Sequence, residues 1–149
     1  MPFPYRIILC PVAFDPNSAE ALAHAVALAM NSGATLYLLH VLQVNPLTAQ
    51  GAAQGFAGQH FYDSQVQAAR ARLAEYAESI PASVKRELAV EIGEPGNSII
   101  AAQQRLGVDL LVMATHGRRG LKHLVLGSVA ERVVRESSAP VLTVRAAAA

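Results

Sequence analysis

The chain has 149 residues, of which 52% are hydrophobic and 15% charged, so it fits a single globular domain, residues 1–149, with a buried core. No apolar run is long enough for a membrane helix, and the first apolar run lacks the pattern of a signal peptide, so we expect a cytoplasmic protein without a membrane partner. Lys and Arg number 12 against 11 for Asp and Glu, so no general field attracts nucleic acid and any anion site must be local.

The first predicted strand runs from Arg6 to Phe14, because its nearly continuous apolar character is typical of a central strand covered on both faces. Cys10 is the only cysteine, which excludes an internal disulfide and a cysteine metal cage, and we expect it to be a small buried hydrophobe. A helix follows, with capping residues over Asp15–Ser18 and a stop at Gly33. A second buried strand is predicted over Leu36–Val44.

The middle of the chain combines a segment without a clear period, a helix and a third strand. Residues from Gln43 to about Gly58 are rich in Gly, Ala and Gln, which predicts a long mobile loop that serves as a lid or a contact surface. An apolar stripe from Val66 to Ile80 predicts the next helix. Over Val84–Ile92 apolar and polar residues alternate, which indicates a less buried strand at a sheet edge.

The last part of the chain contains two further helices and two strands. Gly93–Asn97 predicts a turn, and the apolar residues within Ile99–Leu106 predict a short helix after it. We expect a fourth apolar strand over Val108–Ala114, a helix from about Ser128 to Glu136, and a last strand over Val141–Arg145.

These elements predict an α/β fold in which five strands alternate with four helices. The pattern gives βαβ units, hence a doubly wound, Rossmann-like parallel sheet of strand order 3-2-1-4-5 with helices on both faces. Ligands of such sheets bind outside the carboxyl ends of the strands, where the strand order reverses. The site is therefore expected after strands one, two and four, at residues 11–15, 40–44 and 114–119.

The segment Thr115–Gly120 combines two glycines with two arginines, a composition that suits phosphate binding. Gly127 and Ser128 follow before the last helix, whose unpaired amides and dipole attract anions. Two alternative interpretations of these residues require no ligand. Ser128 and Glu131 can form a capping box, and the basic residues after Gly117 can form a solvated surface cluster.

The five histidines show no zinc-motif spacing, so no structural metal is expected. His116 lies in the phosphate-type segment, but its local sequence offers no nucleophile, so no catalytic residue is predicted. His40, at the end of a buried strand, is expected to be hydrogen-bonded and structural. Neither the P-loop nor the dinucleotide fingerprint is present.

On these residues the chain resembles the universal stress protein family over essentially its whole length. The resemblance is carried by residues 7–12 and 39–41, by Gly93-Glu94-Pro95, and most specifically by the block from Asp109 to Arg145. Members of this family are doubly wound domains of this size, which agrees with the fold that the residue pattern predicts.

The ATP-binding branch of that family is marked by G-x-x-G, nine residues, and then G-[ST]. The chain keeps Gly117, the spacing, Gly127 and Ser128, but has Ala114 at the first glycine. A second departure is Ala13, where the family commonly has an aspartate that faces the nucleoside. The resemblance implies ATP, with Mg²⁺, as the ligand, and leaves AMP or another adenine nucleotide as alternatives.

The site that the resemblance implies is divided between the nucleoside and the phosphates. Val41 would offer backbone hydrogen bonds to adenine, while the glycine-rich segments would surround the phosphates. The expected binding residues are Pro11, Val12, Ala13, Val41, Met113, Ala114, His116, Gly117, Arg118, Gly127, Ser128 and Val129.

The implied function is a nucleotide-dependent regulatory or protective module of the stress response. No water-activating base accompanies the phosphate segment, so ATP hydrolysis is expected to be slow at most. The alternative, favoured by Ala13 and Ala114, is a family member that binds no nucleotide and acts through protein contacts. Val141–Val144 lacks the charges that protect a free strand edge, and similar family members pair through this strand, so we expect a homodimer.

Overall fold

The computed structural model describes residues 3–43, 56–115 and 126–145, and within these ranges five strands alternate with four helices. All strand pairs are parallel, in the order β3-β2-β1-β4-β5, which confirms the predicted doubly wound fold. The strands are β1 (Ile7–Pro11), β2 (Thr35–Leu42), β3 (Arg86–Ile92), β4 (Leu110–Ala114) and β5 (Val141–Val144). The helices are α1 (Pro16–Ser32), α3 (Phe56–Glu78), α4 (Pro95–Leu106) and α5 (Ser128–Glu136).

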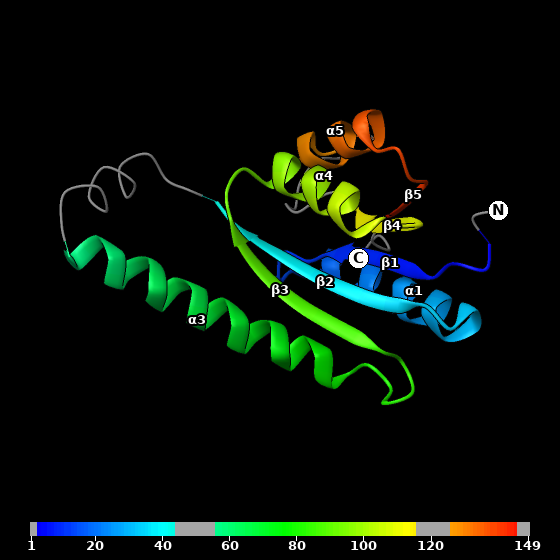
Figure 1. Ribbon diagram of the computed structural model, residues 1–149, viewed down its shortest axis with the longest axis horizontal. Helices are drawn as coiled ribbons and strands as arrows, with labels where there is room; N and C mark the ends of the chain where they lie inside the picture. Colours follow the sequence, from blue (N-terminus) through cyan, green and yellow to red (C-terminus); the bar gives the residue numbers. More distant parts are fainter. Residues whose placement is uncertain (1–2, 44–55, 116–125, 146–149) are drawn as a thin grey trace.

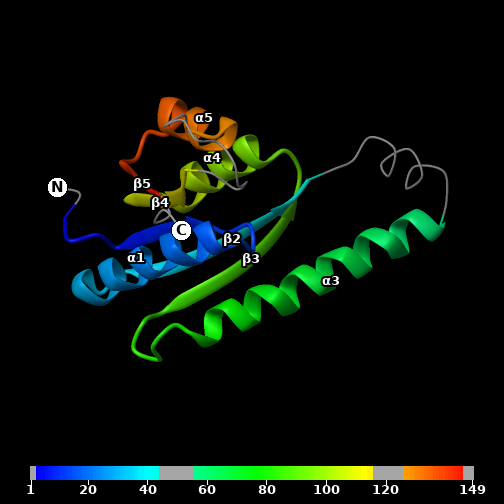
Figure 2. The ribbon, with the colours of Figure 1, turned by 180° about the vertical axis from the view of Figure 1, so that it is seen from behind.

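Helices cover both faces of the sheet, with α1 and α3 on one face and α4 and α5 on the other (Figure 1; seen from behind in Figure 2). Alternate residues of a strand point to opposite faces, so a strand covered on both sides is apolar throughout. In β1, Ile8 and Cys10 belong to the core beside α1 and α3, whereas Leu9 belongs to the core beside α4 and α5. The central strand is therefore buried on both faces, as its apolar run predicts.

The first strand is shorter than predicted, because the chain turns after Pro11. Phe14 has a positive φ of 60°, which takes the backbone out of the strand conformation. Asp15 then caps α1, with its Oδ1 accepting a hydrogen bond of 2.7 Å from the Ser18 N–H. Gly33 closes the same helix in the left-handed conformation, with a φ of 72°, as predicted.

Helix α4 begins earlier than predicted, because the expected turn residues form its first helical turn. Glu94 is the N-cap, and its carboxylate accepts hydrogen bonds from the N–H groups of Gly96 (3.0 Å) and Asn97 (2.7 Å). Pro95 suits the first helical position, since its fixed φ is helical and no N–H donor is needed there. The same Pro and Gly residues that signal a turn thus start a helix.

Helix α3 begins at Phe56, so the segment that precedes it is shorter than its composition suggests. Residues 44–55 lie outside the described residues, and the expected lid or contact role of this segment stays a prediction. Ala69, Leu73 and Ala77 are buried, as the apolar stripe predicts. The N-terminal half of the helix extends beyond the sheet (Figure 1).

Both edge strands carry apolar side chains that are partly open. On β3, which lies at an edge as predicted, Leu88 and Ile92 are 40% and 45% exposed, and on β5 Leu142 is 37% exposed.

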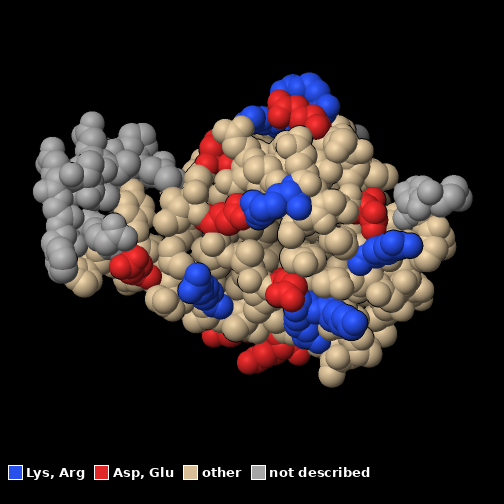
Figure 3. Space-filling model, viewed as in Figure 1, with Lys and Arg blue, Asp and Glu red and all other residues tan. Residues whose placement is uncertain are grey.

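Acidic and basic side chains are interspersed over the face in Figure 3, so neither sign dominates there. None of the described helices combines the length and apolar character that a membrane span requires.

Candidate functional site

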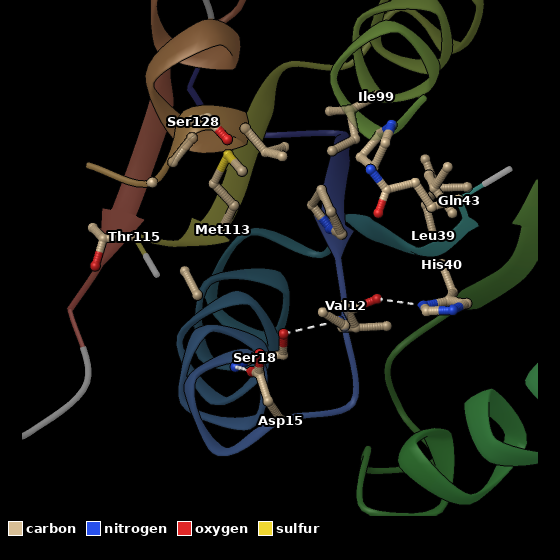
Figure 4. Close-up of a pocket in the computed structure, with 18 residues that line it drawn as sticks. Val12, Asp15, Ser18, Leu39, His40, Gln43, Ile99, Met113, Thr115 and Ser128 are labelled. Atoms are coloured by element: carbon tan, nitrogen blue, oxygen red, sulfur yellow. Dashed lines mark hydrogen bonds between the residues drawn. The ribbon is translucent and has the colours of Figure 1, made fainter. Parts of the chain in front are cut away.

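The strand order reverses at β1, which pairs with β2 on one side and with β4 on the other. A pocket of about 720 Å³ opens beyond the carboxyl ends of these three strands, as expected for a doubly wound sheet. The starts of α4 and α5 form further walls of the pocket, and the turn after β1 lies below it in the close-up of Figure 4.

Nine of the twelve predicted binding residues line this pocket. They are Pro11, Val12, Ala13, Val41, Met113, Ala114, Gly127, Ser128 and Val129. The other three, His116, Gly117 and Arg118, lie outside the described residues, and their role stays a prediction. The structure thus brings together every predicted residue that it describes.

The pocket also contains residues that the sequence did not single out as binding residues. Most of them are next to predicted binding residues in the sequence, at the ends of β1, β2 and β4 or at the start of α5. Pro95 and Ile99 differ, because they come from α4 and only the fold brings them to the site. The added lining residues are Asp15, Ser18, Leu39, His40, Gln43, Pro95, Ile99, Thr115 and Ala130.

The turn after β1 is held by hydrogen bonds within the protein. Ser18 is only 4% exposed, and its Oγ accepts a hydrogen bond of 2.9 Å from the Ala13 N–H. The Asp15 carboxylate accepts from the Ser18 N–H and so serves as the cap of α1. At this turn the side chain that Ala13 contributes to the pocket lining is a methyl group.

His40 is hydrogen-bonded within the protein, as predicted. Its Nδ1 lies 2.8 Å from the Val12 carbonyl oxygen, and because a carbonyl only accepts, Nδ1 carries the proton in this contact. The His40 ring packs on the Phe14 ring with 4.3 Å between their centroids. The Arg72 guanidinium lies 4.4 Å from the centroid of the Phe14 ring. These contacts hold the strained Phe14 backbone in place beside the pocket.

Tyr76 packs against the same ring, with 5.3 Å between the centroids of Tyr76 and Phe14. Burial raises the pKa of the Tyr76 hydroxyl, and the negative charge of Asp15 raises it further, while the Arg72 guanidinium lowers it. Tyr76 therefore stays neutral near physiological pH. It acts here as a packing residue that links α3 to the turn after β1.

The backbone of Val41 points toward the pocket. Backbone groups of successive strand residues are directed to alternate neighbours, and the Leu39 carbonyl accepts from the Val12 N–H on the β1 side, at 2.9 Å. Val41 is two residues further along β2, so its N–H and C=O face the same side. Because β1 has ended at Pro11, those two groups face the pocket instead of a paired strand.

Helix α5 starts at the pocket without a side-chain cap. The expected capping box is wrong: Gly127, not Ser128, is the N-cap, and no side chain bonds to it among the described residues. The reason is the contact between the Gly127 N–H and the Thr115 carbonyl oxygen, at 2.8 Å, which sets the start of the helix. Glu131 instead pairs with Arg135 along the helix, at 2.6 Å. Ser128 thus has no capping role.

Three helix starts line the pocket, and they differ in charge. Asp15 caps α1 and Glu94 caps α4, so each of these starts already holds a carboxylate. Hydrogen bonds from the Asn97 and Gly96 N–H groups lower the pKa of Glu94, and Arg132 lowers it further. Of these three helix starts, that of α5 has no side-chain cap, and the acidic residue of its first turn, Glu131, pairs with Arg135, so its first amides and its positive dipole are left to an anion.

The described part of the site offers no metal-ligand cluster, since no group of three or more His, Cys, Asp or Glu residues converges within the described ranges. Its titratable side chains are Asp15 and His40, and both already bond to the protein. The pocket therefore offers a ligand backbone hydrogen bonds, the side-chain hydroxyl and amide groups of Gln43, Thr115 and Ser128, apolar packing and the dipole of α5.

The chain is similar to known proteins over nearly its whole length. The model of the universal stress protein family matches residues 4–145. Universal stress protein A homolog 2 of Coxiella burnetii is 36% identical over 143 residues, which are 95% of each chain. The solved structure of protein MJ0577 of Methanocaldococcus jannaschii has a TM-score of 0.84 at 25% identity and covers 97% of this chain and 99% of its own.

A further solved structure shares the fold and holds a ligand. It is a universal stress protein from Archaeoglobus fulgidus in complex with dAMP, with a TM-score of 0.67 and 18% identity over 93% of this chain and 95% of its own. At this level of identity the likeness shows the arrangement of strands and helices.

Proposed function

We propose that this chain, which belongs to the universal stress protein family, binds an adenine nucleotide, ATP in the first place, in the pocket beyond β1, β2 and β4. The observation that carries the proposal is the uncapped start of α5, beside two helix starts that carboxylates cap. Phosphate binds favourably at such a start, because the N–H groups lack acceptors and the helix dipole is positive there. The dAMP complex of a protein with this fold supports an adenine nucleotide as the ligand.

In this proposal the phosphates lie against the first turn of α5. The N–H groups of Ser128 and Val129 donate to phosphate oxygens, and Gly127 lets the ligand approach the backbone closely. Gly117 and Arg118 complete the phosphate half by the family resemblance. A Mg²⁺ ion would be held mainly by the phosphate oxygens and water, as is usual for this ion, since the described residues offer no carboxylate cluster.

The nucleoside lies at the ends of β1 and β2 in the same proposal. The Val41 N–H and C=O are a donor and an acceptor on one strand edge, which matches the acceptor N1 and the donor N6 of adenine. Val12 and Met113 supply apolar walls for the base. Ala13 offers the ribose no hydrogen bond from its side chain, so we propose that the phosphates supply most of the affinity.

We propose a regulatory or protective module of the stress response, with slow hydrolysis at most. Activating a water molecule needs a positioned base. Asp15 and His40 are the titratable side chains in the described part of the pocket, and the first caps α1 while the second bonds the Val12 carbonyl oxygen. Both belong to the turn after β1 and to the end of β2, where the proposal places the nucleoside, and not to the start of α5, where it places the phosphates.

The alternative function is that of a family member that binds partners and no nucleotide. Ala13 and Ala114 favour it, because both depart from the pattern of the ATP-binding branch. It predicts that the start of α5 has no anion affinity, so the same experiment distinguishes the two functions.

We also propose that the protein forms a homodimer through β5 (Val141–Val144). The strand pairs with β4 on one side, and its outer edge has no partner among the described strands. Unpaired backbone groups on an apolar edge favour pairing with a second copy. The exposed Leu142 side chain lies on this strand.

Two variants of Ser128 test the nucleotide site without unfolding the helix. Ser128→Asp places a negative charge at the first helical position, which favours α5 by about 0.3–1 kcal/mol through the helix dipole but repels phosphate. Ser128→Asn has a similar size and no charge. We expect calorimetric ATP titration to show binding to the wild type and to Ser128→Asn and none to Ser128→Asp, whose melting temperature is unchanged or higher. Equal binding by both variants would contradict the proposed site.

A further inference from the structure

The two helices that form one side of the pocket are joined to each other by side chains at both ends. Away from the pocket, the Gln103 Nε2 of α4 donates to the Oγ of Ser138, two residues beyond the end of α5, at 2.9 Å. At the pocket end, Arg132 reaches from α5 to the start of α4. Its Nη1 lies 2.8 Å from Glu94 Oε2, and its Nη2 donates to Asn97 Oδ1. One guanidinium thus contacts both the cap and the first turn of α4.

The hydrocarbon part of the same side chain packs on the α4 backbone. Gly96 is buried, and a Cβ atom added there would lie 3.0 Å from Arg132 Cδ and 3.2 Å from Arg132 Nη1. Such distances are shorter than ordinary contacts between carbon atoms. A side chain at position 96 would therefore require the Arg132 side chain to shift, so Gly96 allows a closer contact between Arg132 and α4.

Arg132 differs in this respect from Arg135, the other arginine of α5. Arg135 contacts Glu131 and Glu136, which are residues of the same helix, and its side chain is 61% exposed. The Arg132 side chain is 32% exposed and also contacts Glu136, at 3.3 Å, besides its two partners at the α4 start. Charge-assisted bonds of a half-buried arginine hold a fixed geometry, whereas exposed pairs on one helix contribute little.

We propose that Arg132 is a positioning residue for the phosphate half of the nucleotide site. It is not among the residues that line the pocket. It acts by holding the start of α5 against the start of α4, so that the Ser128 and Val129 N–H groups face the phosphates. The inference rests on the proposed function. It adds that phosphate affinity depends on a contact between two helices outside the pocket.

The test compares Arg132→Gln with the matched control Arg135→Gln in calorimetric titrations with ATP and with adenosine. A misplaced binding group loses affinity for the part of the ligand that it contacts, so Arg132→Gln should weaken ATP roughly tenfold and adenosine less than about twofold. Arg135→Gln should leave both affinities unchanged. Arg132→Lys keeps the charge but not the forked geometry, so its ATP affinity should lie between those of the wild type and Arg132→Gln.

The results that would overturn the inference are specific. If Arg132→Gln binds ATP as the wild type does, or loses ATP and adenosine equally, Arg132 does not position the phosphate half. If Arg132→Gln does not fold, judged by circular dichroism, Arg132→Lys decides, and an unchanged ATP affinity of that variant contradicts the inference. A wild type that binds neither ligand overturns the proposed function and this inference with it. A wild type that binds ATP leaves the proposed function standing whatever the variants do.

Discussion

Ser128 and Ala13 lie in different halves of the pocket and differ in what the protein leaves available to a ligand. Ser128 stands at an uncapped helix start, while the Ala13 N–H is already bonded to the Ser18 Oγ, at 2.9 Å, and its side chain is a methyl group. The start of α5 therefore offers a ligand backbone donors, whereas Ala13 offers neither its N–H nor a polar side chain. This difference predicts that a phosphate-rich ligand binds better than a nucleoside.

Restoring a carboxylate at position 13 should strengthen the nucleoside half. In Ala13→Asp the new side chain can accept a hydrogen bond from a ribose hydroxyl, which is worth on the order of 1 kcal/mol, or about fivefold in affinity. Calorimetric titration with ATP measures the change. Ala13→Leu, which adds comparable bulk without an acceptor, is the control and should not gain affinity. An unchanged or weaker affinity of Ala13→Asp would show that the ribose does not lie at this residue.

The start of α5 at Ser128 depends on a contact that is distant in the sequence. The order Ser-Val-Ala-Glu matches a capping box, yet Gly127 takes the cap position. The Gly127 N–H bonds the Thr115 carbonyl oxygen at the end of β4. A contact between residues twelve apart along the chain shifts the helix start by one residue, and no local pattern reports such a contact. By contrast, the Asp15 cap and the His40 hydrogen bond follow from local sequence and strand position, and both are confirmed.

At the scale of elements, helix α4 depends on the charge of its cap. Glu94 has a lowered pKa in the folded protein, first because the Asn97 and Gly96 N–H groups donate to its carboxylate and then because Arg132 lies beside it. A carboxyl group with a lowered pKa in the folded state stabilises the fold above its unfolded pKa and loses that effect as the pH falls through the folded pKa. The cap of α4 is therefore strongest at neutral pH.

Glu94→Gln tests this cap. The variant keeps one acceptor oxygen but loses the charge, so at pH 7 we expect the free energy of unfolding to fall by about 0.5–1 kcal/mol, at the low end because the carboxylate is 47% exposed. Denaturant melts of both proteins from pH 7 to pH 2 give the pH dependence. The difference should be full at neutral pH and should shrink below the ordinary Glu pKa of 4.5. A difference that stays constant to pH 2 would contradict the charge effect.

Most strands could be predicted, because their information is local. The apolar runs of β1, β2 and β4 indicate strands buried on both faces, and the alternation in β3 indicates an edge. The end of β1 could not be predicted. Phe14 turns the chain with a positive φ that aromatic residues rarely adopt, and its ring contacts with His40 and with Tyr76 of α3 hold it there. These contacts exist only after the sheet and α3 have formed.

At the scale of the whole molecule, the proposed dimer uses one of the two sheet edges, which have no partner strand among the residues that the structure describes. Both edges carry an exposed leucine, Leu142 on β5 and Leu88 on β3, with exposed fractions of 37% and 40%. Leu142→Lys puts a charge on the β5 edge, which disfavours strand pairing between copies. In sedimentation velocity we expect a dimer for the wild type and for Leu88→Lys, and a monomer for Leu142→Lys. A monomer for Leu88→Lys alone would place the contact at the β3 edge.

The position of the pocket in the whole molecule could be predicted from the strand order, since the reversal at β1 places the ends of β1, β2 and β4 together. The α4 wall could not, because Pro95 and Ile99 reach the pocket only through the crossover from β3 to β4. In the sequence, Pro95 and Ile99 are four residues apart, which is a spacing found in any amphipathic helix. The contribution of α4, and with it that of Arg132, needed the three-dimensional structure.

The central claim is that the pocket binds an adenine nucleotide through the start of α5. The most direct test is calorimetric titration of nucleotide-free wild-type protein with ATP, after mass spectrometry of any nucleotide that is released when the purified protein is denatured. We expect saturable binding of one ATP per chain, with adenosine binding more weakly than ATP. The absence of any released nucleotide, together with no heat of binding at millimolar ATP, would contradict it.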